Sequence, residues 1–254
     1  MLRARQATHV ALVFGPLSGR GFRDEIEQRF TSGLIRAVYH SERGITPRMF
    51  AAVARRSSWV DVNIDERAPR LRNVKLPRGL VESQAVIGAA DLRRAGAERP
   101  VIALGLWASL ASPVHRIGAL VTGQREGLTA EIGLAVSPAA LIAVDRLARS
   151  GPLVAMVSDD PIAAELVALA FWRLRHPSST DLPGPWEDPL IQRATELGLG
   201  VTQPSQIAVR ATLLADLSDD ERRDSRTSLS LAMQSLGIEQ GDNQPIVNPM
   251  GAEQ

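Results

Sequence analysis

The chain has 254 residues, of which 44% are hydrophobic and 22% are charged, a composition typical of a globular protein long enough to bury a sizeable core. Its formal net charge of +1 argues against an extended basic surface for nucleic acid or for an anionic membrane. Because there is no cysteine, the sequence excludes disulfides, cysteine-ligated zinc, iron–sulfur clusters and a thiol nucleophile.

The N-terminus gives no sign of a targeting segment. Its basic start is followed by about seven apolar residues, short for a signal-peptide core, and no small-residue cleavage site follows them. No apolar run approaches the roughly 20 residues that are needed to cross a bilayer. We therefore expect a cytoplasmic protein without a membrane partner.

Short apolar runs alternate with stretches of helical periodicity in the first part of the chain. Phe22, Ile26 and Phe30 have the four-residue spacing of an amphipathic helix, for example. This alternation predicts right-handed crossovers and a mainly parallel sheet. The elements expected here are strands at 10–14, 34–39, 59–64 and 101–106, helices at 22–30, 47–56 and 83–95, and a short extended piece at 74–76 within an Arg- and Pro-rich loop.

The second part of the chain is read in the same way. A helix is expected to begin at Ser112-Pro113, and the segment from Gly123 to Gly127 is expected to interrupt the regular structure after it. Beyond this break the expected elements are helices at 137–149, 162–172 and 190–197, strands at 152–157 and 206–209, a proline-rich loop at 176–189, and a last helix that begins near residue 219 and closes on Gly237.

Residues 151–175 give the clearest join of a strand to a helix. Asp160 is a favourable N-cap, and Pro161 suits the first helical position, where its missing N–H costs nothing. Residues 162–172 contain one charge, Glu165, so we expect this helix to lie inside the domain. The apolar run 152–157 is predicted to be an interior strand that leads into it.

These elements predict a three-layer α/β fold, with a mainly parallel sheet covered by helices on both faces. We expect residues 1–215 to form a single domain and residues 216–238 to form an appended helix that docks on the domain or on a partner. Residues 239–254 have little to bury and are expected to be disordered.

Three segments resemble a bacterial and archaeal family catalogued as domain of unknown function three-six-two, whose members are often fused to iron–sulfur ferredoxin modules. The segments are the strand 101–104 with the loop and helix ending at Gly123, the run 157–164 (VSDDPIAA), and the run 191–209 (IQRATELGLGVTQPSQIAV). Together they cover roughly residues 100–210, and the last two are the specific ones. The resemblance implies a diverged member of this family.

The chain also departs from the family pattern. After the first of these strands the family usually has a proline, lysines and a histidine, where this chain reads Gly105-Leu106-Trp107-Ala108-Ser109-Leu110. The family's early lysine-proline-asparagine segment and its ferredoxin module have no counterpart. If the missing residues bind a ligand in relatives, this chain either binds something else or has lost the activity.

Ligands of parallel α/β sheets tend to bind at the carboxyl ends of the strands, where loops and helix N-termini converge. The loop Gly15–Gly21 follows the first strand and could hold a phosphate with backbone N–H groups and Arg20. Its glycine spacing matches neither the P-loop nor the dinucleotide motif, which favours a plain turn as the alternative. The candidate ligand-binding residues are Gly15, Ser18, Gly19, Arg20, Gly21, His40, Gly105, Ser109 and Arg116.

Asp159, Asp160 and His115 are the candidates for a catalytic role, and we expect them at the same strand-end rim as the loop Gly15–Gly21. The two acids could act as a general base or bind a metal, although one of them is needed simply to cap the following helix. His115, in the first turns of its helix, could titrate near neutral pH, and its alternative is a solvated surface residue. The histidines show no metal-ligand spacing, so no metal site is predicted and the cofactor stays unknown.

Two functions remain open from the sequence. One is a protein that binds a small anionic ligand or cofactor at the carboxyl-terminal rim of the strands, with an enzymatic role undecided. The other is a non-catalytic, degenerate family member that acts as a structural or assembly subunit. The expected partners are a small molecule, a second copy of the chain or another protein bound through the C-terminal helix, and neither nucleic acid nor a membrane.

Overall fold

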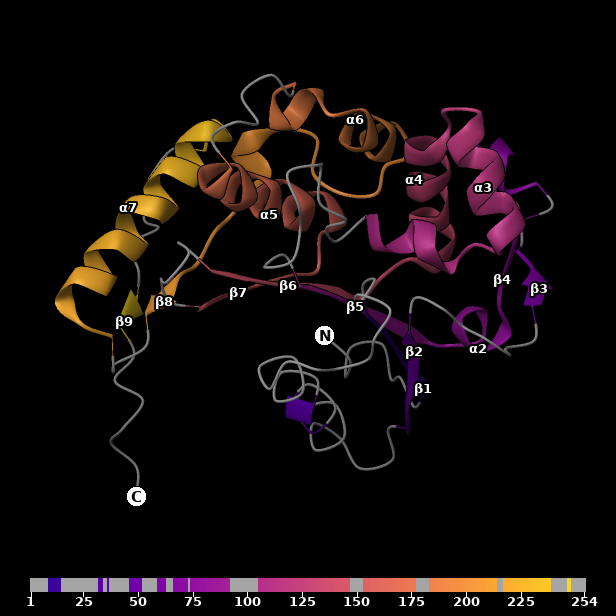
Figure 1. Cartoon of the computed structure of the whole chain (residues 1–254), viewed down its shortest axis with the longest axis horizontal. Coiled ribbons are helices and arrows are strands. Elements are labelled where there is room, and N and C mark those ends of the chain that lie inside the picture. Colours follow the sequence, from indigo (N-terminus) through magenta and orange to yellow (C-terminus); the bar gives the residue numbers. More distant parts are fainter. Residues whose placement is uncertain are drawn as a thin grey trace.

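The fold is that of an α/β protein with one main sheet (Figure 1). The structure is a computed structural model of the chain. The structure describes residues 9–14, 32–33, 36, 46–51, 59–62, 66–72, 74–91, 105–146, 153–176, 183–213, 217–238 and 246–247.

Within the described residues, five strands form the main sheet in the order β2-β1-β5-β6-β7. The first four run parallel to one another, and β7 runs antiparallel to β6, so the sheet is mixed but mostly parallel. The strands are β1 (His9–Phe14), β2 (Thr46–Ala51), β5 (Ala85–Asp91), β6 (Ala140–Arg146) and β7 (Leu153–Ser158).

The expected strand 10–14 is present as β1, but its neighbour comes from a different segment than predicted. The helix expected at 47–56 is wrong because Thr46–Ala51 forms β2, with Pro47 in register with Val10. Proline is tolerated here because β2 is an edge strand, where one N–H can go unpaired. In the predicted strand 34–39, Arg36 is the described residue, and it is helical. The helix expected at 22–30 lies outside the described residues.

The two central strands were both expected to be helices. The predictions of helices at 83–95 and 137–149 are wrong, since these segments contain β5 and β6. Both strands are covered on their two faces, so their apolar residues show no alternation that would separate a buried strand from a buried helix. Ser137, with φ 45°, ends the preceding helix α4 (Arg125–Val136), which the sequence analysis did not predict.

Gly88 is at the centre of β5, where there is no room for a side chain. A Cβ atom there would lie 2.6 Å from Leu141 Cδ2 and 3.0 Å from Leu106 Cδ2. We expect Gly88→Ala to lower the free energy of unfolding by about 1–3 kcal/mol through overpacking, measured by urea unfolding. Gly33→Ala is the matched control, because nothing lies within 4 Å of its Cβ position. Equal effects of the two substitutions would contradict the expected overpacking.

The segment expected to be an interior strand is an edge strand instead. Among the described strands, β6 alone pairs with β7, and residues 154–158 alternate between half-buried and exposed, with Val157 68% exposed. The prediction of an interior strand at 152–157 is therefore wrong. The helix that follows, α5 (Pro161–Arg175), is confirmed as an interior helix, and its Glu165 is fully buried.

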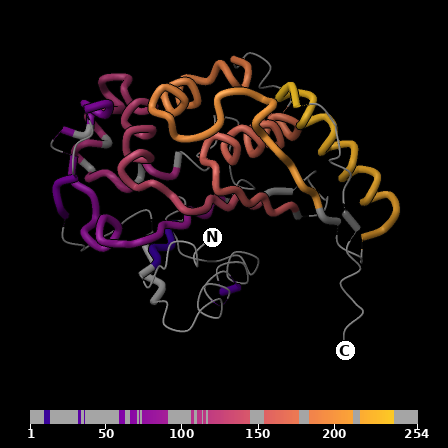
Figure 2. The backbone as a smooth tube through the Cα atoms, turned by 180° about the vertical axis from the view of Figure 1, so that it is seen from behind, coloured from indigo at the N-terminus to yellow at the C-terminus, as the bar shows by residue number. Residues whose placement is uncertain are grey.

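The described α-helices between η4 (Gly105–Leu110) and η7 (Pro204–Gln206) lie on one side of the sheet, as Figures 1 and 2 show from opposite directions. They are α3 (Pro113–Val121), which begins after Ser112 as predicted, α4, α5, and α6 (Pro189–Glu196), which matches the helix expected at 190–197. A short α2 (Arg78–Val81) directly follows Lys75–Pro77, a strand of a second, two-stranded sheet. The core between helices and sheet contains large buried side chains such as Trp107, Trp172 and Leu141.

Smaller elements complete the structure. β3 (Trp59–Asp61) pairs antiparallel with β4 (Lys75–Pro77), near the extended pieces expected at 59–64 and 74–76. Of the strand expected at 101–106, residues 101–104 lie outside the described part, and Gly105–Leu110 is a 3₁₀ helix, η4. Further 3₁₀ turns are η2 (Pro69–Leu71), η6 (Pro185–Glu187) and η7 (Pro204–Gln206).

The C-terminal part contains one long helix. The helix α7 (Asp219–Ser235) packs against α5, and its Ala232 and Met233 are buried there. The strand expected at 206–209 is wrong, because η7 precedes an irregular stretch. Instead, β8 (Thr212–Leu213) pairs with β9 (Ile246–Val247), so part of the expected tail 239–254 is in a strand and the rest lies outside the described residues.

Candidate functional site

The parallel strands end together at one edge of the sheet. Phe14, the last residue of β1, is in register with Ala51 of β2 and with Ala89 of β5, while Asp91 of β5 is in register with Val144 of β6. From β1 the chain moves to β2 on one side, and β5 is then added on the other side. The direction of strand addition reverses between β1 and β5, which is where open α/β sheets usually bind ligands.

Most of the predicted ligand-binding residues follow these strand ends but lie outside the described residues. Gly15, Ser18, Gly19, Arg20 and Gly21 come directly after β1 in the sequence. His40 also falls outside the part of the chain that the structure describes. The position of the strand end at Phe14 is thus known, and the positions of these side chains stay predictions.

Asp159 and Asp160 do not lie at that edge. They follow β7, which runs antiparallel to its neighbour, and Ser158 is in register with Leu141 near the beginning of β6. Both acids therefore lie at the amino-terminal edge of the parallel strands. The expectation that they share one rim with the loop after β1 is wrong, because the sequence gives no sign that the last strand reverses direction.

The carboxylate of Asp160 is bound by two backbone N–H groups. Its Oδ1 accepts from Ala163 N at 2.8 Å, which caps α5, and its Oδ2 accepts from Val201 N at 2.8 Å. A Cβ at Gly200 would lie 2.6 Å from the Asp160 carboxyl carbon, so glycine allows this close approach. Asp160 thus joins the start of α5 to the segment after α6, while Asp159 is exposed.

The remaining candidates lie in η4 and in the first turns of α3. His115 is half-buried in the first turn, where its Nδ1 lies 2.5 Å from Ser112 Oγ. Gly105 and Ser109 belong to η4, and Arg116 belongs to α3; only the backbone of Ser109 and Arg116 is described. The His115–Ser112 contact is local to the start of α3.

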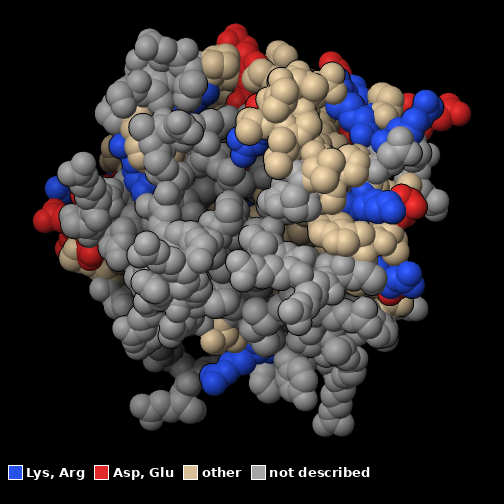
Figure 3. Space-filling view, turned by 45° about the vertical axis from the view of Figure 1, so that its right-hand side comes forward, with Lys and Arg blue, Asp and Glu red and all other residues tan. Residues whose placement is uncertain are grey.

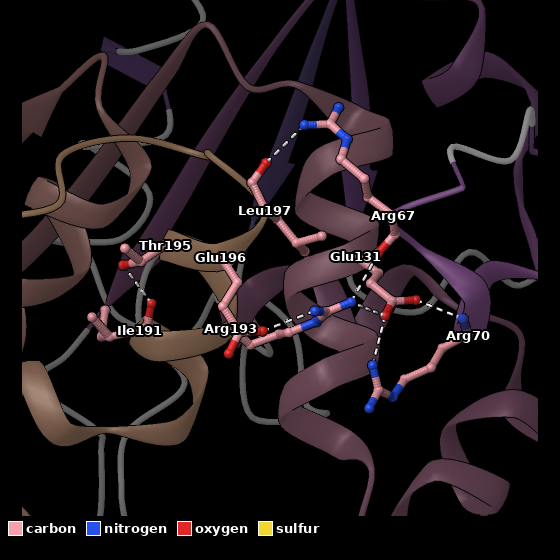
Figure 4. Close-up of polar contacts among 8 residues, drawn as sticks. All are labelled: Arg67, Arg70, Glu131, Ile191, Arg193, Thr195, Glu196 and Leu197. Atoms are coloured by element: carbon pink, nitrogen blue, oxygen red, sulfur yellow. Dashed lines mark hydrogen bonds and ion pairs between the residues drawn. The ribbon is translucent and has the colours of Figure 1, made fainter.

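A buried ion cluster centres on Glu131 of α4 (Figure 4). This side chain is fully buried, and its Oε1 accepts from Arg70 Nη1 at 2.7 Å and from Arg193 Nη2 at 2.9 Å. Its Oε2 accepts from the backbone N of Arg70 at 2.7 Å. Sequence reasoning missed the cluster because its members are 61 and 62 residues apart. A glutamate inside the apolar run of α4 was the available signal.

The two arginines tie separate elements to α4. Arg193 of α6 also bonds Glu196 Oε2 at 2.9 Å and the backbone O of Arg67 at 2.8 Å. The hydrogen bonds to Glu196 and then to Glu131 raise the pKa of Arg193 above its ordinary value, so its charge is retained. Both oxygens of Glu131 accept hydrogen bonds within the protein, and this arrangement joins η2, α4 and α6 rather than presenting a carboxylate to a ligand.

Comparisons with known proteins were made by family model, by sequence and by structure. None gives a match. Among the described residues, no group of three or more His, Asp or Glu side chains is arranged to hold a metal ion. No described helix is both long and apolar enough to cross a membrane.

Proposed function

We propose that the chain binds a small anionic ligand at the carboxyl-terminal edge of β1 and β5. The observation that supports this proposal is the strand order, because the direction of strand addition reverses between these two strands. The segment that follows β1, Gly15–Gly21, contains three glycines and Arg20. Glycine-rich segments at such a position bind phosphate or carboxylate groups through backbone N–H groups.

In this proposal Arg20 supplies the positive charge and the neighbouring backbone supplies hydrogen-bond donors. A guanidinium binds a phosphate or carboxylate through two parallel N–H donors, which gives both charge and orientation. Gly15 and Gly21 allow the backbone to approach the ligand closely. The proposal is one of binding and assigns no reaction; Asp91, the last residue of β5, is a described acid at this edge.

Thermal unfolding with and without ligand tests the proposal. With inorganic phosphate, nucleotides or small organic acids as probes, a specific ligand at about 100 times its dissociation constant should add roughly 2.7 kcal/mol to the free energy of unfolding. We expect Arg20→Gln to reduce this gain and the control Arg72→Gln, at an exposed arginine before β4, to leave it unchanged. Absence of stabilisation by every probe, or equal loss in both variants, would count against the site.

A second candidate is a non-catalytic structural or assembly subunit. It is favoured by the contacts of Asp160 and Glu131, whose carboxylate oxygens all accept hydrogen bonds from the protein itself. Carboxylates used in this way hold the fold together and are not available as a general base. An assembly role predicts a solution mass above that of one chain and no stabilisation by the anionic probes.

Three further expectations are part of the same proposal. They are the helical layer on the second face of the sheet, the cytoplasmic location, and membership of the family named above in a diverged form. The covered faces of β5 support the helical layer, since a central strand buried on both faces needs cover on each side. A crystal structure that shows which segments cover this face of the sheet would test the helical layer.

A further inference from the structure

We draw no further inference here: the strongest candidate, the exposed apolar face of α3 on the side of the molecule that Figure 3 turns forward, carries none because nothing in the part of the chain that the structure describes shows what covers Val114, Ile117, Leu120 and Val121.

Discussion

Replacing Arg70 and Arg193 together by methionine is expected to lower the free energy of unfolding by about 3–5 kcal/mol, measured by urea unfolding. Methionine keeps most of the apolar stem and removes the guanidinium groups that lie 2.7 Å and 2.9 Å from Glu131 Oε1. The carboxylate of Glu131 is fully buried, so water cannot replace the lost partners without a rearrangement. One hydrogen bond, from the backbone N of Arg70, would remain.

Removing the buried charge should reverse much of this loss. We expect Glu131→Gln, added to the double variant, to recover a large part of the lost free energy of unfolding, because a neutral amide is less costly to bury than an unpaired carboxylate. Glu196→Gln is the control. It removes the other partner of Arg193 at a 64% exposed position and should cost less than about 1 kcal/mol. A triple variant no more stable than the double variant would show that buried charge is not the cause.

Two helix starts were predicted correctly from local signals, although the same kind of pair, Ser137-Pro138, lies between α4 and β6 and begins no helix. Asp160 before Pro161 and Ser112 before Pro113 mark the first turns of α5 and α3, as expected. These signals are local, since an N-cap residue and the proline beside it act on backbone groups within one turn. They could therefore be read without knowledge of the tertiary structure.

Buried strands were the part of the fold that the sequence predicted worst. The segments of β5 and β6 were taken for helices, because strands covered on both faces show apolar runs without the two-residue period. The reversed direction of β7 was not foreseen either. Strand direction depends on how the chain returns between strands, and no local pattern records it. The prediction of one shared rim therefore failed for Asp159 and Asp160.

The candidate site was predictable only where its contacts are local in the sequence. The capping role of Asp160 follows from the residues beside it, whereas its bond to Val201 joins positions 41 residues apart. The Glu131 cluster depends on similar long-range contacts. A carboxylate in an apolar helix signals that some partner is needed, since buried charges are paired, but it does not identify which arginine supplies it.

The double contact of Asp160 leads to the second large expected effect. Asp160→Ala should lower the free energy of unfolding by about 2–4 kcal/mol, the sum of a lost helix cap and of an N–H of Val201 left without its acceptor. Asp159→Ala is the matched control at an exposed neighbour and should change stability by less than about 0.5 kcal/mol. Comparable losses in both variants would contradict the structural role of Asp160.

Gly200 provides the sharper test, because its effect should depend on Asp160. Gly200→Ala alone should cost about 1–3 kcal/mol, since its Cβ would lie 2.6 Å from the Asp160 carboxyl carbon and would displace the carboxylate. In the Asp160→Ala background the obstruction is gone, and the same substitution should cost almost nothing. Contacting residues give such non-additive effects, and the double-mutant cycle measures them. If the two losses simply added, the absence of a side chain at position 200 would need another cause than room for this carboxylate.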